Sequence, residues 1–279
     1  MELRICHLYP RLMNIYGDRG NILCLVQRCR WRGIKVEVEE ISLKDKIDPQ
    51  RYDFYFAGGG QDRQQIVVSQ DLQGDKKKAL KEAEEREVPM LLICGSYQLF
   101  GHYFKPFKGP KLPGIGIFDA YTVASKKRKI GNIVIEIRNP QPAIRNSEFL
   151  VGFENHSGNT YIRNSNSPHF AKASRGKQIP NSKTCPLGKV IVGFGNNGED
   201  GTEGAVYKNV FGCYLHGSLL PKNPHFADFL IKLALERKYG PVDLKTLDDS
   251  LEWQAHNFAL KRAQWLKRRN GFDIIKARH

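Results

Sequence analysis

The 279-residue sequence lacks the marks of a membrane-spanning or disulfide-rich protein. Its 6 cysteines are sparse and form no CxxC pair, so we expect neither a disulfide framework nor a zinc site. No apolar run approaches the ~18 residues of a membrane span, and charges interrupt the first apolar stretch, unlike a secretory signal. The 41% hydrophobic and 26% charged residues predict a globular, cytoplasmic protein with a buried core.

A phosphate-binding loop is missing too. The two Gly-Lys pairs, at 176–177 and 188–189, lack the earlier glycine and the following Ser or Thr of the G-x-x-x-x-G-K-[ST] pattern. We therefore expect this chain to bind neither ATP nor a metal and to carry no cofactor of its own.

Basic residues exceed acidic ones by 15, which alone would suggest a nucleic-acid partner. The excess is local, because residues 157–185 and 260–279 carry net charges of +5 and +6 and leave +4 for the rest. We expect no nucleic-acid binding. The basic C-terminal segment is interpreted as a solvated helix face, a contact with an acidic partner surface, or an attraction to anionic lipid.

Strand and helix signals alternate in the first third of the chain. Helical spacing at 21–32 and 75–87 separates strand-like runs at 2–9, 34–38, 52–56 and 88–93. This order predicts an α/β fold with a mostly parallel central sheet flanked by helices, and ligands at the carboxyl ends of the strands. Strand-like runs recur without long helices between them at 115–123, 132–138, 148–154, 189–194 and 209–215, so we also expect additional antiparallel strands.

The chain divides into one domain over 1–245 and an extension over 246–279. Residues 158–186 are rich in Asn, Ser, Lys and Pro, which is typical of a basic surface insertion. A helix is expected from 223 to 239, and another from 246 to 270 in a basic, partly helical extension. The extension's aromatics, Trp253, Phe258 and Trp265, fit a helix-packing stripe.

Residues 91–101, LLICGSYQLFG, carry the strongest chemical signal. A buried strand runs into Cys94, then into small residues and a helix, which is the strand–turn–helix order of a nucleophile elbow. The helix N-terminus favours a thiolate, and the N–H of Gly95 would lie near an oxyanion formed at the sulfur. A structural cysteine closing a core strand is the alternative.

A thiolate nucleophile needs a proton shuttle, normally a histidine. His7 and His156 could reach the sheet edge, but His216 is the best placed. It ends the apolar run FGCYLH at 211–216, and such a strand can lie beside the Cys94 strand. A purely structural histidine is the alternative.

Several motifs in order resemble those of class I glutamine amidotransferases of the cobyric-acid-synthase branch: GGGQD at 58–62, CGSYQ at 94–98 and YLHG at 214–217. Within that branch, four further segments are similar to the GatD family, the glutaminase subunits of lipid II isoglutaminyl synthases: YGDRGN at 16–21, WRGI at 31–34, GFENH at 152–156 and GNNGEDGTEG at 195–204. The resemblance covers roughly residues 3–240 apart from the insertion.

The resemblance implies a glutaminase site. Cys94 would attack the side-chain amide of L-glutamine, and His216 would act as general acid and base. The N–H groups of Gly59 and Gly95 would hold the oxyanion. Arg128 matches the arginine that holds glutamine in the family, although its basic surroundings alone would indicate a solvated turn.

The resemblance also implies a partner. The family pairs with a MurT-like Mur ligase subunit as a heterodimer, and ATP and Mg²⁺ belong to that synthetase subunit. Ammonia would amidate the D-glutamate α-carboxylate of lipid II to D-isoglutamine in peptidoglycan biosynthesis, at the inner face of the membrane through the complex. A corrinoid or other carboxylate acceptor, or a non-catalytic relative of the family, is the alternative.

One position departs from the wider class. Many class I enzymes have Glu two residues after the catalytic histidine, and Ser218 stands there instead. Three possibilities follow: an Asp or Glu from elsewhere orients His216, the site is a Cys–His dyad, or the partner supplies the carboxylate.

Overall fold

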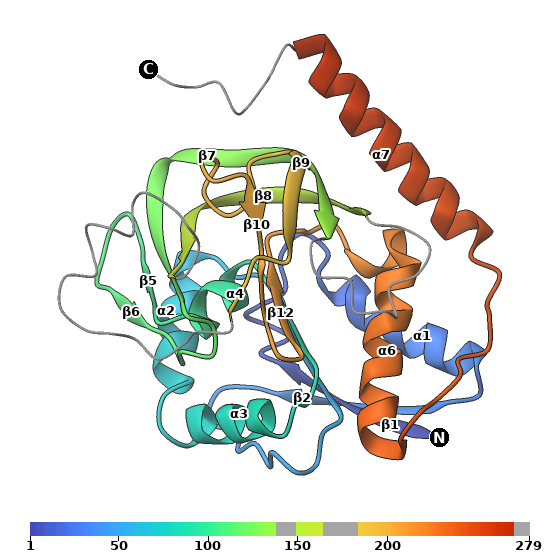
Figure 1. The fold of residues 1–279 in the computed structure, drawn as a ribbon. Helices are drawn as coiled ribbons and strands as arrows, with labels where there is room; N and C mark the ends of the chain where they lie inside the picture. Colours follow the sequence, from blue (N-terminus) through green and yellow to red (C-terminus); the bar gives the residue numbers. More distant parts are fainter. Residues whose placement is uncertain (138–148, 164–183, 271–279) are drawn as a thin grey trace.

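The computed structural model describes residues 1–137, 149–163 and 184–270, without the side chains of 266–270. Two six-stranded sheets form its framework, with helices around the first (Figure 1). The first sheet has the order β11-β12-β4-β3-β1-β2. Its strands are β1 (Glu2–Leu8), β2 (Lys35–Ile41), β3 (Phe54–Ala57), β4 (Met90–Ile93), β11 (Ala205–Tyr207) and β12 (Val210–Cys213).

Every neighbouring pair in the first sheet is parallel except β11 and β12. Strands β3, β4 and β12 are buried along their whole length, because helices and the second sheet cover both faces. The predicted mostly parallel central sheet is confirmed.

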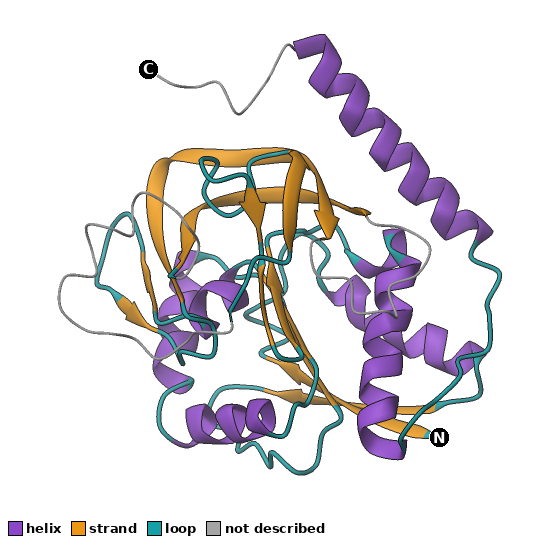
Figure 2. Ribbon diagram, viewed as in Figure 1, coloured by secondary structure: helices purple, strands orange, loops and turns teal. Residues whose placement is uncertain are grey.

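Helices lie on both sides of the first sheet (Figure 2). On one side α1 (Arg19–Trp31) packs against α6 (Pro224–Tyr239), which follows the short helix η1 (Leu220–Lys222). On the other side lie α2 (Asp62–Asp71) and α3 (Asp75–Glu85). The short α4 (Gly95–Phe100) follows β4 directly. Helix α2 was not predicted, since its sequence, DRQQIVVSQD, has few apolar residues at helical spacing.

The second sheet has the order β10-β9-β7-β5-β6, with β8 also paired to β7. Its strands are β5 (Tyr103–Lys105), β6 (Leu112–Pro113), β7 (Ala120–Ile137), β8 (Phe149–Ile162), β9 (Gly188–Val192) and β10 (Thr202–Glu203). Residues 120–123 and 132–137 of the strands expected at 115–123 and 132–138 belong to one 18-residue strand, β7, whereas residues 115–119 form no strand. The pairing of β7 with β8 shifts register between Ala124 and Lys129, which accommodates the four basic residues at 126–129 within the strand.

The surface insertion expected at 158–186 is wrong for its first residues. Strand β8 continues through Ile162, paired with β7, and Thr160 is buried. Small and polar residues indicated a loop there, but they alternate along the strand and half of them face the interior. At the other end of the prediction, Thr184 is buried and Cys185 pairs with Val206, whereas residues 164–183 lie outside the described residues.

The expected C-terminal helix is confirmed as α7 (Ser250–Asn270), which extends past the rest of the fold (Figure 1). Ala263 packs with Val134 and Val151 of the second sheet, and Trp253 stacks on His225 with ring centroids 5.2 Å apart. Phe258 is 66% exposed, so the predicted packing stripe is wrong for this residue. Residues 271–279 lie outside the described residues.

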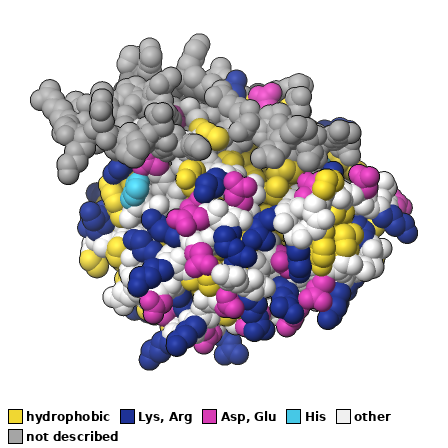
Figure 3. Space-filling model, turned by 60° about the horizontal axis from the view of Figure 1, so that its bottom comes forward, with side chains coloured by type: hydrophobic (Ala, Val, Ile, Leu, Met, Phe, Trp, Pro, Cys, Tyr) yellow, Lys and Arg dark blue, Asp and Glu magenta, His cyan; other side chains and the backbone are white. Residues whose placement is uncertain are grey.

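The molecular surface shows mixed charge on the face seen in Figure 3, where Lys and Arg side chains alternate with Asp and Glu. The described residues include no helix with the length and hydrophobicity to cross a membrane.

Candidate functional site

Cys94 and His216 meet at the carboxyl edge of the first sheet. Strands β4 and β12 are parallel neighbours with Ile93 opposite Cys213, so Cys94 and the segment after Cys213 leave the sheet together. The N–H of Cys94 donates to the Cys213 carbonyl at 2.7 Å, which carries the pairing one residue beyond β4. The predicted placement of the two strands is confirmed.

Cys94 occupies a strained turn. Its φ of 51° and ψ of −102° lie outside the regions that a residue with a side chain favours, at a cost of ~1–3 kcal/mol. This backbone directs the side chain out of the sheet as α4 begins, as a nucleophile elbow requires. Cys94 is 5% exposed, and it lines a cavity of about 360 Å³.

The cavity is mainly polar. Its remaining lining comes from the loop after β1, the segment after β3, helices α2 and α4, and the second sheet: Ile15, Tyr16, Gly60, Gln61, Asp62, Arg63, Gln65, Gln98, Phe104, Arg128, Asn155, His156 and Ser157.

Asp18 orients His216, a role that the sequence reasoning missed. The two side chains are fully buried, and Asp18 Oδ1 lies 3.0 Å from His216 Nδ1. The interaction of His216 with Cys94 therefore falls to Nε2, which hydrogen-bonds to no other described residue. Burial favours the neutral ring, but the charges of Cys94 and Asp18 outweigh it and raise the pKa of His216 to about 10.

Ser218 does not replace the missing glutamate. Its hydroxyl donates to the Gly17 carbonyl at 2.6 Å, so it holds the loop that carries Asp18. Of the three possibilities left by the sequence, the structure supports a carboxylate from elsewhere in the chain. Asp18 belongs to the motif YGDRGN, and that motif was the available signal.

The N–H of Gly59, predicted to hold an oxyanion, is already engaged. It donates to Asp18 Oδ2 at 2.6 Å, and Gly59 does not line the cavity. The prediction for Gly59 is therefore wrong, and the adjacent peptide has the better geometry. Ile15 N–H donates to the Gly59 carbonyl at 3.2 Å, and a trans peptide then turns the Gly60 N–H the opposite way. Gly60 lines the cavity.

Gly95, predicted to help hold an oxyanion, lies against Gly60. A methyl group on Gly95 would come 2.9 Å from the Gly60 nitrogen and 2.4 Å from Gln65 Nε2. Neither the Gly60 N–H nor the Gly95 N–H donates to any residue that the structure describes. Two free amides thus lie beside the Cys94 backbone.

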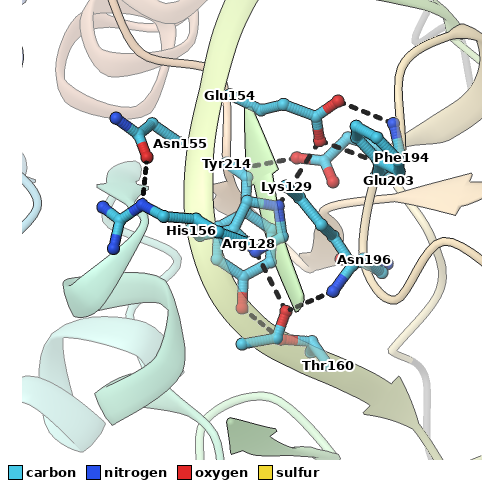
Figure 4. Close-up of polar contacts among 12 residues, drawn as sticks. Arg128, Lys129, Glu154, Asn155, His156, Thr160, Phe194, Asn196, Glu203 and Tyr214 are labelled. Atoms are coloured by element: carbon cyan, nitrogen blue, oxygen red, sulfur yellow. Dashed lines mark hydrogen bonds and ion pairs between the residues drawn. The ribbon is translucent and has the colours of Figure 1, made fainter. Parts of the chain in front are cut away.

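Arg128, predicted from the resemblance to hold glutamine, lies on β7 and lines the cavity. Its Nε donates to Asn155 Oδ1 at 2.6 Å and its Nη2 to the Tyr16 hydroxyl at 3.0 Å. Figure 4 shows Arg128 and Asn155 on the opposite side of the group from Glu154 and Glu203. The guanidinium is therefore held in place and does not belong to a freely solvated turn.

The other candidate histidines have structural surroundings. His7 is buried within β1, and burial lowers its pKa to about 4. His156 stacks on Tyr214 with centroids 3.6 Å apart, and its Nδ1 lies 2.9 Å from the Gly158 carbonyl. Burial lowers the pKa of His156 well below its ordinary value, so His156 forms a neutral wall of the cavity.

A buried polar cluster behind that wall was not predicted either (Figure 4). Glu154 accepts N–H groups from Phe194 at 2.6 Å and Gly195 at 3.0 Å, and Glu203 accepts the N–H of Tyr214. Burial raises the pKa of Glu154 to about 7 and that of Glu203 to about 8. The two carboxyl groups connect the 194–204 loop and the end of β12 to the second sheet. The alternating polar residues of β8 were the signal.

Comparisons with known proteins agree with this arrangement. The model of the CobB/CobQ-like glutamine amidotransferase domain matches residues 4–224. The chain is 39% identical over 269 residues to the Staphylococcus aureus GatD subunit of lipid II isoglutaminyl synthase (glutamine-hydrolyzing), with 96% of this chain and 98% of the relative covered. Identity to the Streptococcus pneumoniae GatD subunit is 37% over 255 residues, with 90% and 87% covered.

A solved structure extends the likeness of the fold. The structure of PurLQS from Thermotoga maritima matches with a TM-score of 0.51 at 15% identity, covering 93% of this chain and 100% of that one. Fold and matched domain together define a glutamine amidotransferase of the class I, CobB/CobQ-like type. Within that class, the chain belongs to the family of GatD subunits.

Proposed function

We propose that the chain hydrolyses L-glutamine through a covalent thioester on Cys94. The proposal rests on one arrangement of side chains, in which His216 lies between Cys94 and Asp18 beside a polar cavity. The raised pKa of His216 favours its protonated form, and a protonated imidazole beside Cys94 would favour the thiolate, which is the reactive form of a cysteine nucleophile.

In the first half-reaction, the Cys94 thiolate adds to the δ-amide carbon of glutamine and the carbonyl oxygen becomes an oxyanion. The N–H groups of Gly60 and Gly95 stabilise that charge, and each such donor contributes ~3 kcal/mol in comparable sites. Imidazolium His216 gives its proton to the amide nitrogen. The C–N bond then breaks, leaving ammonia and a thioester.

In the second half-reaction, the now neutral His216 removes a proton from water, and the resulting hydroxide attacks the thioester carbon. Collapse of this second tetrahedral intermediate breaks the C–S bond, releasing glutamate and restoring the thiolate. Asp18 keeps the ring of His216 in one orientation throughout. Arg128 binds the α-carboxylate of glutamine as a charged donor.

The ammonia serves a partner subunit in this proposal. Relatives named as subunits of lipid II isoglutaminyl synthase support a partner subunit, and we propose that it is a MurT-like Mur ligase in a heterodimer with this chain. That partner would bind ATP and Mg²⁺, activate the D-glutamate α-carboxylate of lipid II as an acyl phosphate, and accept ammonia to form D-isoglutamine. We place the reaction in the cytoplasm, where ATP is supplied, and no cofactor belongs to this chain.

The test uses the full chain together with the MurT-like subunit encoded by the same organism. Ammonia release from glutamine, and amidation of lipid II with ATP, are expected with the native chain and lost with Cys94→Ala and with His216→Ala. Free ammonium should restore amidation in both variants, because the synthetase needs only ammonia. Undiminished ammonia release by Cys94→Ala would refute the mechanism.

The same mixture separates the alternative acceptor from lipid II. If glutamine is hydrolysed but only a corrinoid carboxylate is amidated in the presence of a suitable synthetase, the glutaminase mechanism stands and the peptidoglycan assignment falls. A chain that neither releases ammonia nor reacts at Cys94 would be a non-catalytic relative.

A further inference from the structure

Tyr16 stands at the mouth of the cavity in an unusual conformation. It belongs to the loop between β1 and α1, its φ is +55°, and its side chain lines the cavity while the residue is 41% exposed. A residue with a bulky side chain rarely adopts a positive φ, and it persists there only where its surroundings hold it.

Two contacts hold Tyr16, and each reaches a different part of the site. Its hydroxyl accepts the hydrogen bond from Arg128 Nη2 at 3.0 Å. Its ring packs edge to face against the His216 imidazole, with centroids 5.0 Å apart and an interplanar angle of 76°. One side chain therefore touches both the arginine at the cavity wall and the buried histidine behind Cys94.

The contact with Tyr16 leaves one edge of the Arg128 guanidinium free to bind a ligand. Asn155 Oδ1 takes the Nε donor and Tyr16 takes one Nη2 donor, so the plane of the group is set from one edge. Nη1 hydrogen-bonds to no residue that the structure describes, which leaves the Nη1–Nη2 edge available to a carboxylate.

The loop of Tyr16 also reaches the catalytic groups through its backbone and Asp18. Ile15 orients the Gly59–Gly60 peptide, and Asp18 binds both His216 and the Gly59 N–H. Displacing Tyr16 would disturb a segment that contacts Arg128, His216 and the Gly59–Gly60 peptide.

We propose that Tyr16 is a positioning residue that aligns Arg128 with the α-carboxylate of glutamine through its hydroxyl and keeps His216 in register with Cys94 through its ring. This rests on the proposed function and assigns Tyr16 two separable parts in it. The hydroxyl affects substrate binding, whereas the ring affects both binding and the reactivity of Cys94.

Tyr16→Phe and Tyr16→Ala separate the two parts in the full chain with its synthetase partner. Tyr16→Phe should raise KM for glutamine about 3–10-fold with kcat within about twofold, the effect of one lost hydrogen bond. Tyr16→Ala should also lower kcat about 10-fold or more, since the imidazole loses its packing. Tyr239, which is similarly exposed and distant from the cavity, provides the matched control when replaced in the same two ways.

Two alkylating agents provide a readout that general structural damage would not reproduce. 6-Diazo-5-oxo-L-norleucine carries the amino-acid carboxylate and should label Tyr16→Phe several-fold more slowly, while iodoacetamide, which lacks it, should label Cys94 of that variant at the native rate. Tyr16→Ala should be slower with both reagents.

The outcomes separate this inference from the function beneath it. Tyr16→Phe could release ammonia at the native rate, with an unchanged KM and an unchanged rate of labelling by the norleucine reagent. That result would overturn the positioning role of Tyr16 alone. A native chain that neither releases ammonia with its partner nor reacts with the norleucine reagent would overturn both proposals. If Tyr16→Ala fails to fold, the KM and labelling pattern of Tyr16→Phe still decides.

Discussion

Asp18 Oδ1 lies 3.0 Å from His216 Nδ1 although 198 positions separate them in the chain. The second carboxylate oxygen accepts the N–H of Gly59 at 2.6 Å. One buried side chain therefore sets both the histidine ring and the loop that faces Cys94, and it joins two parts of the site that the resemblance treated as separate.

Replacing Asp18 with Asn should impair the chemical step. The amide keeps the shape but loses the charge that helps to hold a proton on His216, so the pKa of His216 should fall and the wrong tautomer becomes accessible. We expect kcat for ammonia release to fall by ~10³-fold, with a smaller change in KM. Steady-state kinetics over a range of pH measures both effects. Asp75→Asn, at an exposed carboxylate, should have native kinetics.

The chain should hydrolyse glutamine without its partner. Asp18, His216, Cys94 and two free amides all come from this one polypeptide, so no catalytic group is left for another subunit to supply. We expect ammonia release by the isolated full chain to lie within ~10-fold of the rate in the complex, since a missing triad carboxylate would cost far more. A gain above ~10³-fold on adding the synthetase would show that the partner completes the site.

Gly95→Ala should displace the Gly60 N–H, one of the two proposed oxyanion donors, and leave the Cys94 nucleophile in place. The new methyl group would lie 2.9 Å from the Gly60 nitrogen, and backbone yields less readily than the Gln65 side chain that it also meets. Moving the Gly60 peptide away should lower kcat by ~10²–10³-fold, the usual effect of losing one donor. Iodoacetamide should still alkylate Cys94, and a variant with native kcat would exclude the Gly60 amide from this role.

Sequence reasoning found the parts of the site that follow from strand order. The apolar runs before Cys94 and His216 predict neighbouring strands, and the residues that end those runs share a sheet edge. Asp18 could not be found this way, because it lies in an irregular loop and its partner is distant in sequence. The sequence also predicted Gly59, and not the adjacent Gly60, as an oxyanion donor. This error has a similar origin, because a single hydrogen bond from Ile15 sets the orientation of the Gly59–Gly60 peptide.

The same reasoning misjudged the second sheet for a physical reason. A run of four basic residues before Ile130 resembles a solvated loop, yet a bulge lets it continue as a strand with Lys129 turned inward. Polar residues of β8, such as Glu154 and Thr160, indicate surface by composition. They are buried because they hydrogen-bond to one another, to backbone and to the 194–204 loop.

Those buried carboxyls predict a pH-dependent stability. Burial raises the pKa of Glu203 from 4.5 to about 8, so the protonated form is favoured in the folded state. The resulting contribution is fully present below about pH 4.5 and is lost as pH rises through about 8. Glu203→Gln should flatten the decline of the free energy of unfolding across this range, measured by urea denaturation at several pH values. Glu85→Gln, on an exposed side chain, should leave the slope unchanged.

Removing the buried Arg28 should lower the free energy of unfolding more than removing an exposed ion-paired arginine. Its guanidinium is 1% exposed and binds Asp228 of α6 at 2.7 Å and Asp249, just before α7, at 2.6 Å. Arg28→Ala leaves Asp249 without this cation and Asp228 with Arg32 alone, and breaking a buried ion pair in this way typically lowers the free energy of unfolding by about 3 kcal/mol. Arg4→Ala, at a largely exposed ion pair, should cost less than ~1 kcal/mol. Equal free energies of unfolding for Arg28→Ala and Arg4→Ala would show that the buried Arg28 ion pairs are no stronger than the exposed pair of Arg4.

Arg28→Ala should also make the α7 segment more accessible to limited proteolysis, because Asp249 immediately precedes α7.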